Sequence, residues 1–239
     1  MTFRMTAGIV AVAGLASVAS ADVPWSPANG SGTFFDYFLG HNSNTNLFGN
    51  PTLVGNSFLF FPSNFTAQSI GGNAAAATDQ INVQLVAHPG QRFTSINIQE
   101  FGTWALSGVG SMQDTGTMFI TDLINPRPIN QTPVIASMGY NVVGPVGTPT
   151  TMPITTPGTG TWSGSVTIDL DAIAGPAWTS IMLVFTNTLQ ASTTGANSAA
   201  TITKKVVNGP SIILTPVPAP ASGALLGAGC VLMARRRRR

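Results

Sequence analysis

Residues 81–85 read INVQL, a strict alternation of apolar and polar side chains. Successive side chains of a β-strand point to opposite faces, so this pattern is typical of a strand with one face in a core and one in solvent. The alternation returns at 93–101, where Ile96 and Ile98 share a face, and at 162–170. Further strands are predicted at 33–39, 57–61, 117–123, 133–143, 181–185, 200–207 and 211–214.

About ten short strands, divided by Gly, Pro and Asn turns and without a long amphipathic helix, predict an all-β fold. The expected architecture is a single antiparallel β-sandwich of jelly-roll type over residues 22–214. The four alanines at 74–77 are expected to form at most one helical turn. Segment 148–160 is rich in Thr, Pro and Gly, so it is expected to be a loop that caps the sandwich.

The amino terminus has the features of an export signal. Arg4 gives a basic start, residues 5–18 are apolar, and Ala19 and Ala21 flank a serine in a small-x-small cleavage site. That order is typical of a secretory signal peptide, expected as a helix over residues 1–21 with cleavage before Asp22.

At the other end, a short motif, an apolar span and a cationic cluster follow one another. The motif is Val217, Pro218, Ala219 and Pro220; the span covers 221–234; the cluster is Arg235, Arg236, Arg237, Arg238 and Arg239. Each arginine costs about 3 kcal/mol at the bilayer centre and positive residues stay inside, so an exported chain is expected to halt here with its body outside. As a short hydrophobic helix the span reaches about 21 Å, against a hydrocarbon core of about 30 Å, which suits transient residence better than permanent anchoring.

This tail resembles the PEP-CTERM sorting signal of bacterial exported proteins, which is also labelled the ice-binding protein C-terminal domain. The resemblance covers 217–239, with Ala219 where the family most often has glutamate. It implies the secretion machinery and an exosortase-like processing protease as partners for segment 215–239. It also implies transient contact of 221–239 with the inner membrane, and then release to the cell surface or the extracellular polysaccharide matrix.

Charge is scarce in the body and negative in sum. Between Asp22 and Pro216 eight acidic and four basic side chains give a net charge near −4, although the whole chain carries +2. This balance excludes the basic surface that binds nucleic acid. In an average globular protein about 25% of residues are charged, a far larger share than the twelve charged residues of this body. The edge strands here therefore lack much of the charge that usually protects a sheet against self-association. The body has no cysteine, since Cys230 lies in the tail.

Residue types used in catalysis are few and scattered. A Ser-His-Asp triad would need His41 or His88, with Asp36 or Asp114 to orient it, and no nucleophile elbow precedes a helix. A turn is the better interpretation for His88, which precedes Pro89.

Two carboxylate pairs have the chemistry of glycoside hydrolysis. Asp169 and Asp171 share the polar face of one predicted strand, whereas Glu100 and Asp122 pair only if the fold brings them together. Carboxylates on a polar strand face are usually just solvated. No catalytic residue is therefore predicted, and the chain is not expected to be an enzyme.

Alternating asparagines at Asn42, Asn44 and Asn46 raise the question of calcium. Calcium sites normally include charged oxygens, which this segment lacks unless Asp36 or Asp79 supplies one. Asparagine also adopts left-handed conformations and bonds to nearby backbone, so a tight loop is the better interpretation. No metal or other cofactor is predicted.

Carbohydrate binding is the main alternative. The aromatic candidates are Trp25, Tyr37, Trp104, Tyr140, Trp162 and Trp178. Trp104 and Trp162 follow strand patterns and are expected in the core, whereas Trp25 and Trp178 neighbour prolines and are expected in loops. Two exposed aromatics and an amide on one concave face would favour a sugar site.

The sequence therefore predicts an exported, exosortase-sorted surface or matrix protein with a structural or adhesive role. A carbohydrate-binding module of the extracellular polysaccharide is the alternative, and a glycoside-active enzyme or an ice-binding protein ranks behind it. The ice-binding hypothesis rests on Thr-x-Thr pairs at 115/117, 159/161, 186/188 and 201/203, whose spacing is irregular.

Overall fold

The chain is built from strands throughout the part that the structure describes. This computed structural model describes residues 21–124, 134–144, 149–173, 175, 177–205 and 209–219. The strands are β1 (Val23–Pro24), β2 (Gly30–Ser31), β3 (Phe35–Asn42), β4 (Thr52–Val54), β5 (Ser57–Phe60), β6 (Thr66–Ile70), β7 (Ala74–Ala87), β8 (Phe93–Asp122), β9 (Val134–Ser137), β10 (Gly139–Val143), β11 (Pro149–Thr150), β12 (Gly158–Asp169), β13 (Ser180–Thr203) and β14 (Ile212–Pro218). Over these residues there is no helix long and apolar enough to span a bilayer. The predicted all-β class is confirmed, and the two predicted terminal helices lie outside the described residues.

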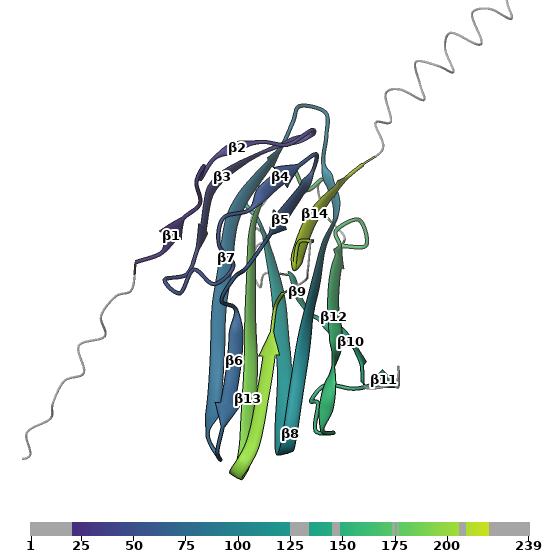
Figure 1. Cartoon of the computed structure of the whole chain (residues 1–239). Coiled ribbons are helices and arrows are strands. Elements are labelled where there is room, and N and C mark those ends of the chain that lie inside the picture. Colours follow the sequence, from purple (N-terminus) through teal and green to yellow (C-terminus); the bar gives the residue numbers. More distant parts are fainter. Residues whose placement is uncertain are drawn as a thin grey trace, which may run out of the picture.

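Two long strands, β8 and β13, form the centre of the fold and pair with each other in antiparallel register. The register shifts between Thr194 and Ala199, where Gly108 and Gly195 have φ angles of 76° and 98°. Glycine adopts these angles at little cost, and here both strands fold back at one end of the molecule (Figure 1). The two-stranded ribbon that β8 and β13 form is thereby folded in half, so one continuous sheet supplies both layers of the sandwich.

The two halves of the ribbon belong to facing layers. In the first layer, residues 180–194 of β13 lie between β7 and residues 109–122 of β8, with β3 and β1 beyond β7 and β9 beyond β8. In the second layer, residues 93–107 of β8 pair with β12, which is followed by β10 and β11. On the other side of this half of β8 lie β14 and the end of β13, extended by β5 and β6. The predicted antiparallel β-sandwich is confirmed.

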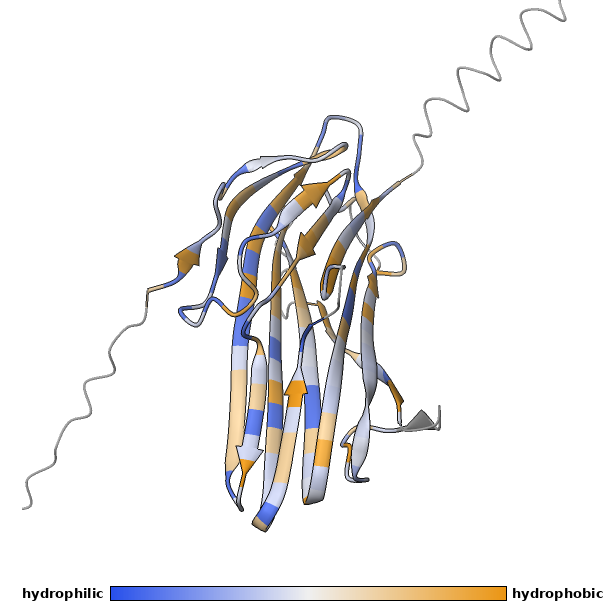
Figure 2. Ribbon diagram, viewed as in Figure 1, coloured by the Kyte–Doolittle hydropathy of each residue, from blue (hydrophilic) through white to orange (hydrophobic). Residues whose placement is uncertain are grey.

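Alternation along the strands separates core from surface. From Ile181 to Leu189 every second residue of β13 is buried, and Figure 2 shows hydrophobic and hydrophilic segments alternating along the strands. Aromatic rings fill one end of the core, with neighbouring centroids 5.1 to 6.2 Å apart. They are Trp25, Phe34, Phe35, Tyr37, Phe48, Phe58, Phe60 and Phe65. Burial of one such side chain contributes about 2 kcal/mol, so this cluster is a main source of stability.

Three predictions of local structure are wrong. Residues 74–77 are not a helical turn but part of β7, because their backbone pairs with 189–192 of β13 and that pairing overrides alanine's preference for helix. Several strands are longer than predicted, and the described residues form 14 strands rather than about ten. β8 runs without a break through Gly102, where a Cβ would lie 2.2 Å from the Thr203 carbonyl oxygen. Segment 148–160 is not only a loop, because it contains β11 and the start of β12.

The C-terminal strand continues into the predicted sorting segment. The strand predicted at 211–214 extends to Pro218 in β14. Thr94 Oγ1 donates to the carbonyl of Val217 at 3.1 Å, and the Ala219 amide donates to the Arg92 carbonyl at 3.0 Å. The first residues of the motif are therefore held against β8, whereas Pro220 and the arginines lie outside the described residues.

Candidate functional site

The carboxylates of Asp169 and Asp171 stabilise the turn after β12. Asp169 Oδ1 accepts hydrogen bonds from the amides of Asp171 and Ala172 at 3.0 and 3.2 Å. Asp171 forms a two-pronged ion pair with Arg92, which immediately precedes β8, the strand that pairs with β12 in the same layer. Both groups are exposed and take part in local contacts, as expected of polar residues that end a strand.

The two histidines each lie beside one carboxylate. His41 Nε2 is 3.3 Å from Asp22 Oδ2, and His88 Nε2 is 3.2 Å from Asp36 Oδ1. The hydroxyl of Ser31 also donates to Asp36, and this hydrogen bond, followed by that of His88, lowers the pKa of Asp36. The carboxylate thus lies between serine and histidine, whereas a catalytic triad requires the histidine in the middle.

Asp79 is the carboxylate that reaches the asparagine-rich loop. It is buried, its Oδ2 accepts the Phe48 amide at 2.9 Å, and Ser43 Oγ donates to its Oδ1. Asn46 has a φ of 46°, and its Oδ1 accepts a hydrogen bond from Asn42 at 2.6 Å. These contacts support the loop interpretation. Among the described residues no group of three His, Cys, Asp or Glu is placed to hold a metal ion.

The predicted aromatic candidates lie mainly in the core. Trp104 and Trp162 are 3% and 2% exposed, which confirms their predicted burial. Trp25 and Trp178 lie outside the named strands, as expected, but they are also 3% and 2% exposed, so both rings are buried. Apolar packing on the inner face outweighs the local effect of a neighbouring proline. None of the four indoles can therefore form an exposed platform for a sugar.

A groove that the sequence analysis missed crosses the outer face of the second layer. It is lined by three cross-strand rows, each with one residue from β8, β12 and β10. The rows are Gln99, Ser165 and Gly139; Phe101, Ser163 and Asn141; and Thr103, Thr161 and Val143. Two adjoining hollows of about 500 and 510 Å³ follow these rows. We call this surface the Phe101 groove, since Phe101 is the aromatic residue in the three rows, among amides and hydroxyls; Tyr140, Trp162 and Lys205 also line the hollows.

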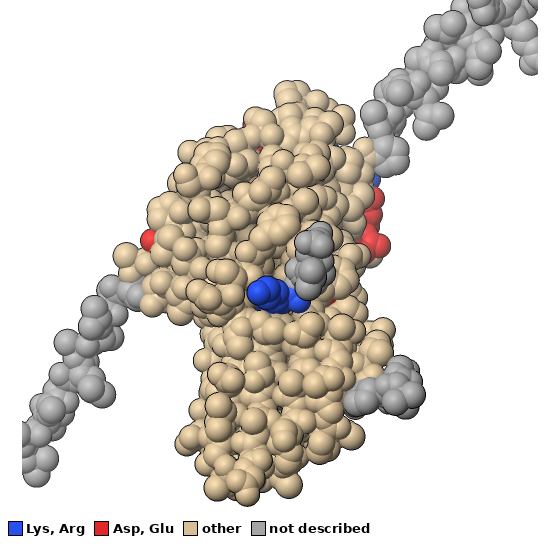
Figure 3. Space-filling model, viewed as in Figure 1, with Lys and Arg blue, Asp and Glu red and all other residues tan. Residues whose placement is uncertain are grey.

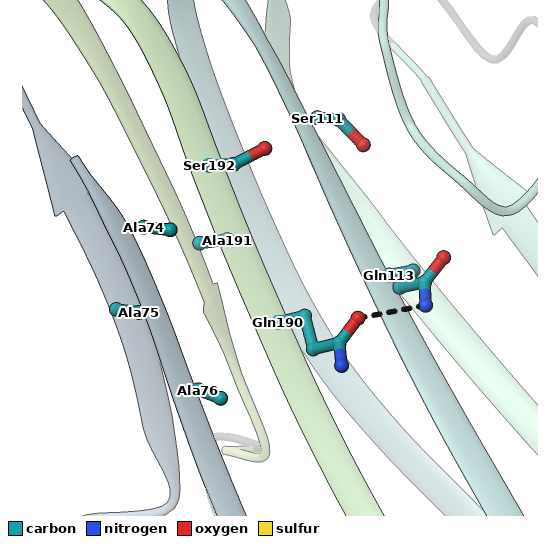
Figure 4. Close-up of a pocket in the computed structure, with 8 residues that line it drawn as sticks. All are labelled: Ala74, Ala75, Ala76, Ser111, Gln113, Gln190, Ala191 and Ser192. Atoms are coloured by element: carbon teal, nitrogen blue, oxygen red, sulfur yellow. Dashed lines mark hydrogen bonds between the residues drawn. The ribbon is translucent and has the colours of Figure 1, made fainter. Parts of the chain in front are cut away.

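A second hollow lies on the outer face of the first layer (Figure 4) and has a volume of about 380 Å³. It is lined by Ala74, Ala75, Ala76, Ser111, Gln113, Gln190, Ala191 and Ser192. Gln113 Nε2 donates to Gln190 Oε1 at 2.8 Å. The hollow exists because small side chains stand together on β7, and it offers only neutral hydrogen-bonding groups.

Two of the four Thr-x-Thr pairs come together on this same layer. Thr188 lies opposite Thr115 and Thr186 opposite Thr117 in the β13–β8 register. Thr188 Oγ1 is also 2.9 Å from the hydroxyl of Thr78 on β7. The pairs at 159/161 and 201/203 lie on strands of the second layer. The threonines therefore do not form one regular array.

The densest polar chemistry is buried between the layers, in a group we call the charge cluster: Glu100, Asp114, Asn187 and Lys204. Lys204 Nζ donates to Glu100 Oε2 at 2.7 Å and to Asp114 Oδ2 at 3.0 Å. Asn187 Nδ2 donates to the same Glu100 oxygen at 2.7 Å. The side chains of Lys204 and both acids have no exposed surface. The cluster joins both halves of β8 to the first half of β13 and to the residue that follows β13.

The cluster decides two arrangements of acidic residues that the sequence left open. Glu100 lies beside Asp114 rather than Asp122, which is eight residues further along an extended strand, about 26 Å from Asp114. Asp114 contacts Lys204 and does not orient a histidine. The alternation of apolar and polar residues along the strands could have revealed the cluster. Glu100 falls on the same inward face as Ile98, and Lys204 on the same inward face as Ile202.

Burial controls protonation in the charge cluster. Desolvation raises the pKa of Glu100 to about 8, with Lys204 opposing the shift, and the charge and hydrogen bond of Asp114 adding to it. Burial also raises the pKa of Tyr140, and the nearby acids Asp114 and Glu100 add to that shift. At neutral pH the carboxyl group of Glu100 is therefore largely protonated.

Fold and surface together define a charge-poor all-β sandwich with neutral outer faces and one buried ionic cluster. No protein-family model and no curated protein matches the chain. Several solved structures align with the chain weakly. The alignment with the carbohydrate-binding module TmCBM61 in complex with β-1,4-galactotriose covers 81% of this chain and 91% of that module, at 8% identity and a TM-score of 0.24. Tailspike protein 4 of bacteriophage CBA120 covers 72% and 20%, at 6% identity and 0.21; VP2 of infectious bursal disease virus covers 74% and 47%, at 13% identity and 0.17. Likeness at these TM-scores transfers no function.

Proposed function

We propose that this protein is exported and serves a structural or adhesive role, without catalysis, at the cell surface or in the extracellular matrix. The observation that carries this proposal is the near absence of surface charge. The structure describes eleven charged side chains of the body, of which five are buried: Asp79, Glu100, Asp114, Asp122 and Lys204. Six remain, and Figure 3 shows one face on which charged atoms are few and scattered.

A surface of this kind favours contact with other neutral surfaces. Long-range repulsion between copies is weak because there are few charges to repel. Serine, threonine, asparagine and glutamine offer hydrogen bonds along the strands, and edge strands carry little charge to prevent pairing with another chain. Such association is harmful in a dilute soluble protein but useful in a matrix.

The position of β14 bears on processing by an exosortase-like protease. Val217 and Pro218 pair with β8, so a cut before them would remove part of the sheet. We place the cut beyond Pro218, where it releases the sandwich intact and leaves the apolar span in the membrane.

Replacing Arg235, Arg236, Arg237, Arg238 and Arg239 by glutamine is expected to abolish retention at the membrane. A reporter fused behind residue 239 should stay in the cytoplasm in the wild type and reach the periplasm in the variant, because the barrier of buried positive charge is gone. Fractionation with protease protection measures the side, and mass spectrometry of both chain ends reports cleavage.

Lys205→Gln is the control for the arginine variant, since it removes an exposed cation from the body and should leave retention unchanged. A wild-type reporter in the periplasm, or an unprocessed wild-type chain dissolved in the cytosol, would rule out this proposal.

The Phe101 groove supports carbohydrate binding as a second candidate. A partly exposed ring beside Ser163, with Asn141 one strand further across and Gln99 two residues along β8, offers one stacking surface and several neutral hydrogen bonds. Such a surface suits an uncharged polysaccharide. The cluster of small side chains around it leaves room for a chain rather than a single sugar.

Phe101→Ala is expected to reduce retention on a neutral polysaccharide column at least tenfold, the equivalent of losing about 1.4 kcal/mol of binding. Phe61→Ala is the matched control, because Phe61 is exposed on a different part of the surface. Equal retention of both variants and wild type would exclude this groove. Concentration-dependent polymer formation without sugar, measured by sedimentation, would favour the structural role.

A further inference from the structure

The charge cluster places an amine against a carboxyl group in the core, where neither side chain has exposed surface. Lys204 Nζ lies 3.0 Å from Asp114 Oδ2, and Glu100 Oε2 lies 2.7 Å from the same nitrogen. The Trp162 ring centroid is 4.7 Å from Nζ, and the Phe65 centroid is 5.3 Å from it. The amine is therefore enclosed by aromatic faces on one side and by two carboxyl groups on the other.

The formal charges of this cluster do not balance. One ammonium faces two carboxylates, and with both acids ionised Glu100 Oε1 and Asp114 Oδ1 have no hydrogen-bond donor. A buried net charge is costly, so the cluster must hold an extra proton between its acids. The raised pKa of Glu100 agrees with this proton balance. A neutral amine, together with a neutral carboxylic acid, removes the remaining charge separation.

We propose that Lys204 and Asp114 form an intramolecular amide bond between Nζ and Cγ, with Glu100 as the acid–base group. Neither residue needs to move far, since Nζ already contacts the carboxyl group that it attacks. Asn187 holds Glu100 in place through its hydrogen bond to Oε2. The aromatic enclosure keeps water from the site and favours the uncharged forms of the reactants.

The reaction is a condensation without oxidation or reduction. Lys204 passes a proton to Asp114, and the lone pair of the neutral amine forms a bond to Cγ as the carbonyl π bond opens. Glu100 donates its proton to the departing hydroxyl and takes one from the nitrogen. The Cγ–O bond breaks, and one amine plus one carboxylic acid become one amide plus one water molecule.

The bond would tie the two layers of the sandwich together. Asp114 lies in the half of β8 that belongs to the first layer, and Lys204 follows the half of β13 that belongs to the second. Force that separates the layers would then act on a covalent bond. Such a tie suits a secreted protein whose body contains no cysteine for disulfides.

Mass spectrometry of the purified, denatured full body tests the bond. The expected mass is one water molecule below the sum of its residues, after both chain ends have been mapped. Proteolysis should release one branched peptide that joins Lys204 to Asp114. Lys204→Arg and Asp114→Ala should restore the linear mass, Glu100→Gln should leave most chains uncondensed, and the control Lys205→Arg should retain the water loss.

A linear mass for folded wild-type protein would overturn the proposal even if every variant failed to fold. Loss of ammonia, with a branched peptide at Asn187, would overturn the assignment to Asp114. Full condensation in folded Glu100→Gln would overturn the role of Glu100. These results are independent of where the protein is exported.

Discussion

Lys204→Met is expected to destabilise the folded protein by about 3–5 kcal/mol or to prevent folding. Methionine keeps an apolar stem of similar length but removes the ammonium that contacts Glu100 and Asp114. Both acids would then be buried without a cation. Urea unfolding, followed by circular dichroism, measures the change in the free energy of unfolding.

If Lys204 and Asp114 are joined, the same replacement also opens a covalent loop. The two residues are 90 positions apart, and the loop-entropy relation used for disulfides gives a further loss of about 4–5 kcal/mol. A loss of about 3–5 kcal/mol in the free energy of unfolding therefore indicates an ion pair alone. A loss that is larger by about 4–5 kcal/mol indicates an amide bond.

Two variants control this experiment. Lys205→Met removes the neighbouring exposed cation and should change stability by no more than about 0.5 kcal/mol. The triple variant Lys204→Met, Glu100→Gln, Asp114→Asn should recover part of the loss, because no ionised group remains in the core. If Lys204→Met and Lys205→Met were equally stable, the described burial of the cluster would be incorrect.

The pH dependence gives an independent check on the uncondensed cluster. The pKa of Glu100 rises from 4.5 to about 8 on folding, chiefly because of burial. Between these values the folded protein binds a proton that the unfolded chain releases, so this contribution is greatest below pH 4.5 and is lost as pH rises to about 8. Glu100→Gln should flatten the dependence, whereas Lys204→Met should extend it to higher pH. A flat profile in uncondensed wild type would contradict the raised pKa.

Strands were predictable from the sequence because their signal is local. The alternation at 81–85 has a period of two, and a short window is enough to identify the strand and its inward face. The pairing of 74–77 was not predictable in the same way, because its partner at 189–192 is remote in sequence. The local preference of alanine is for helix, so residues 74–77 by themselves gave no sign of a strand.

The charge cluster was only partly predictable for the same reason. The faces of Glu100 and Lys204 follow from their apolar neighbours in β8 and β13. The role of an inward-facing charge can be inferred only when its partner is known. Asp114 becomes a partner of Lys204 only because the pair of strands β8 and β13 folds back near Gly108. The Phe101 groove also needs the register of three strands, which no single segment contains.

Trp25→Ala is expected to cost about 3–5 kcal/mol, as large-to-small changes of buried aromatics do. The indole centroid lies 6.2, 5.5 and 5.7 Å from those of Tyr37, Phe58 and Phe60. Its Nε1 donates to Asn42 Oδ1 at 3.0 Å. Removal of the ring leaves a cavity at the aromatic end of the core and a buried amide without its donor. Thermal or urea unfolding measures the loss.

Phe61→Ala is the matched control, because Phe61 is 54% exposed and its truncation should cost no more than about 0.5 kcal/mol. Trp25→Phe should recover the ring contacts but not the hydrogen bond, and so retain a deficit of about 1–2 kcal/mol. If Trp25→Ala were as stable as Phe61→Ala, the Trp25 ring would not be part of the core. The result also limits processing of the chain: a signal-peptidase cut beyond Trp25 would cause the same loss as its replacement, so a stable exported body must begin before this residue.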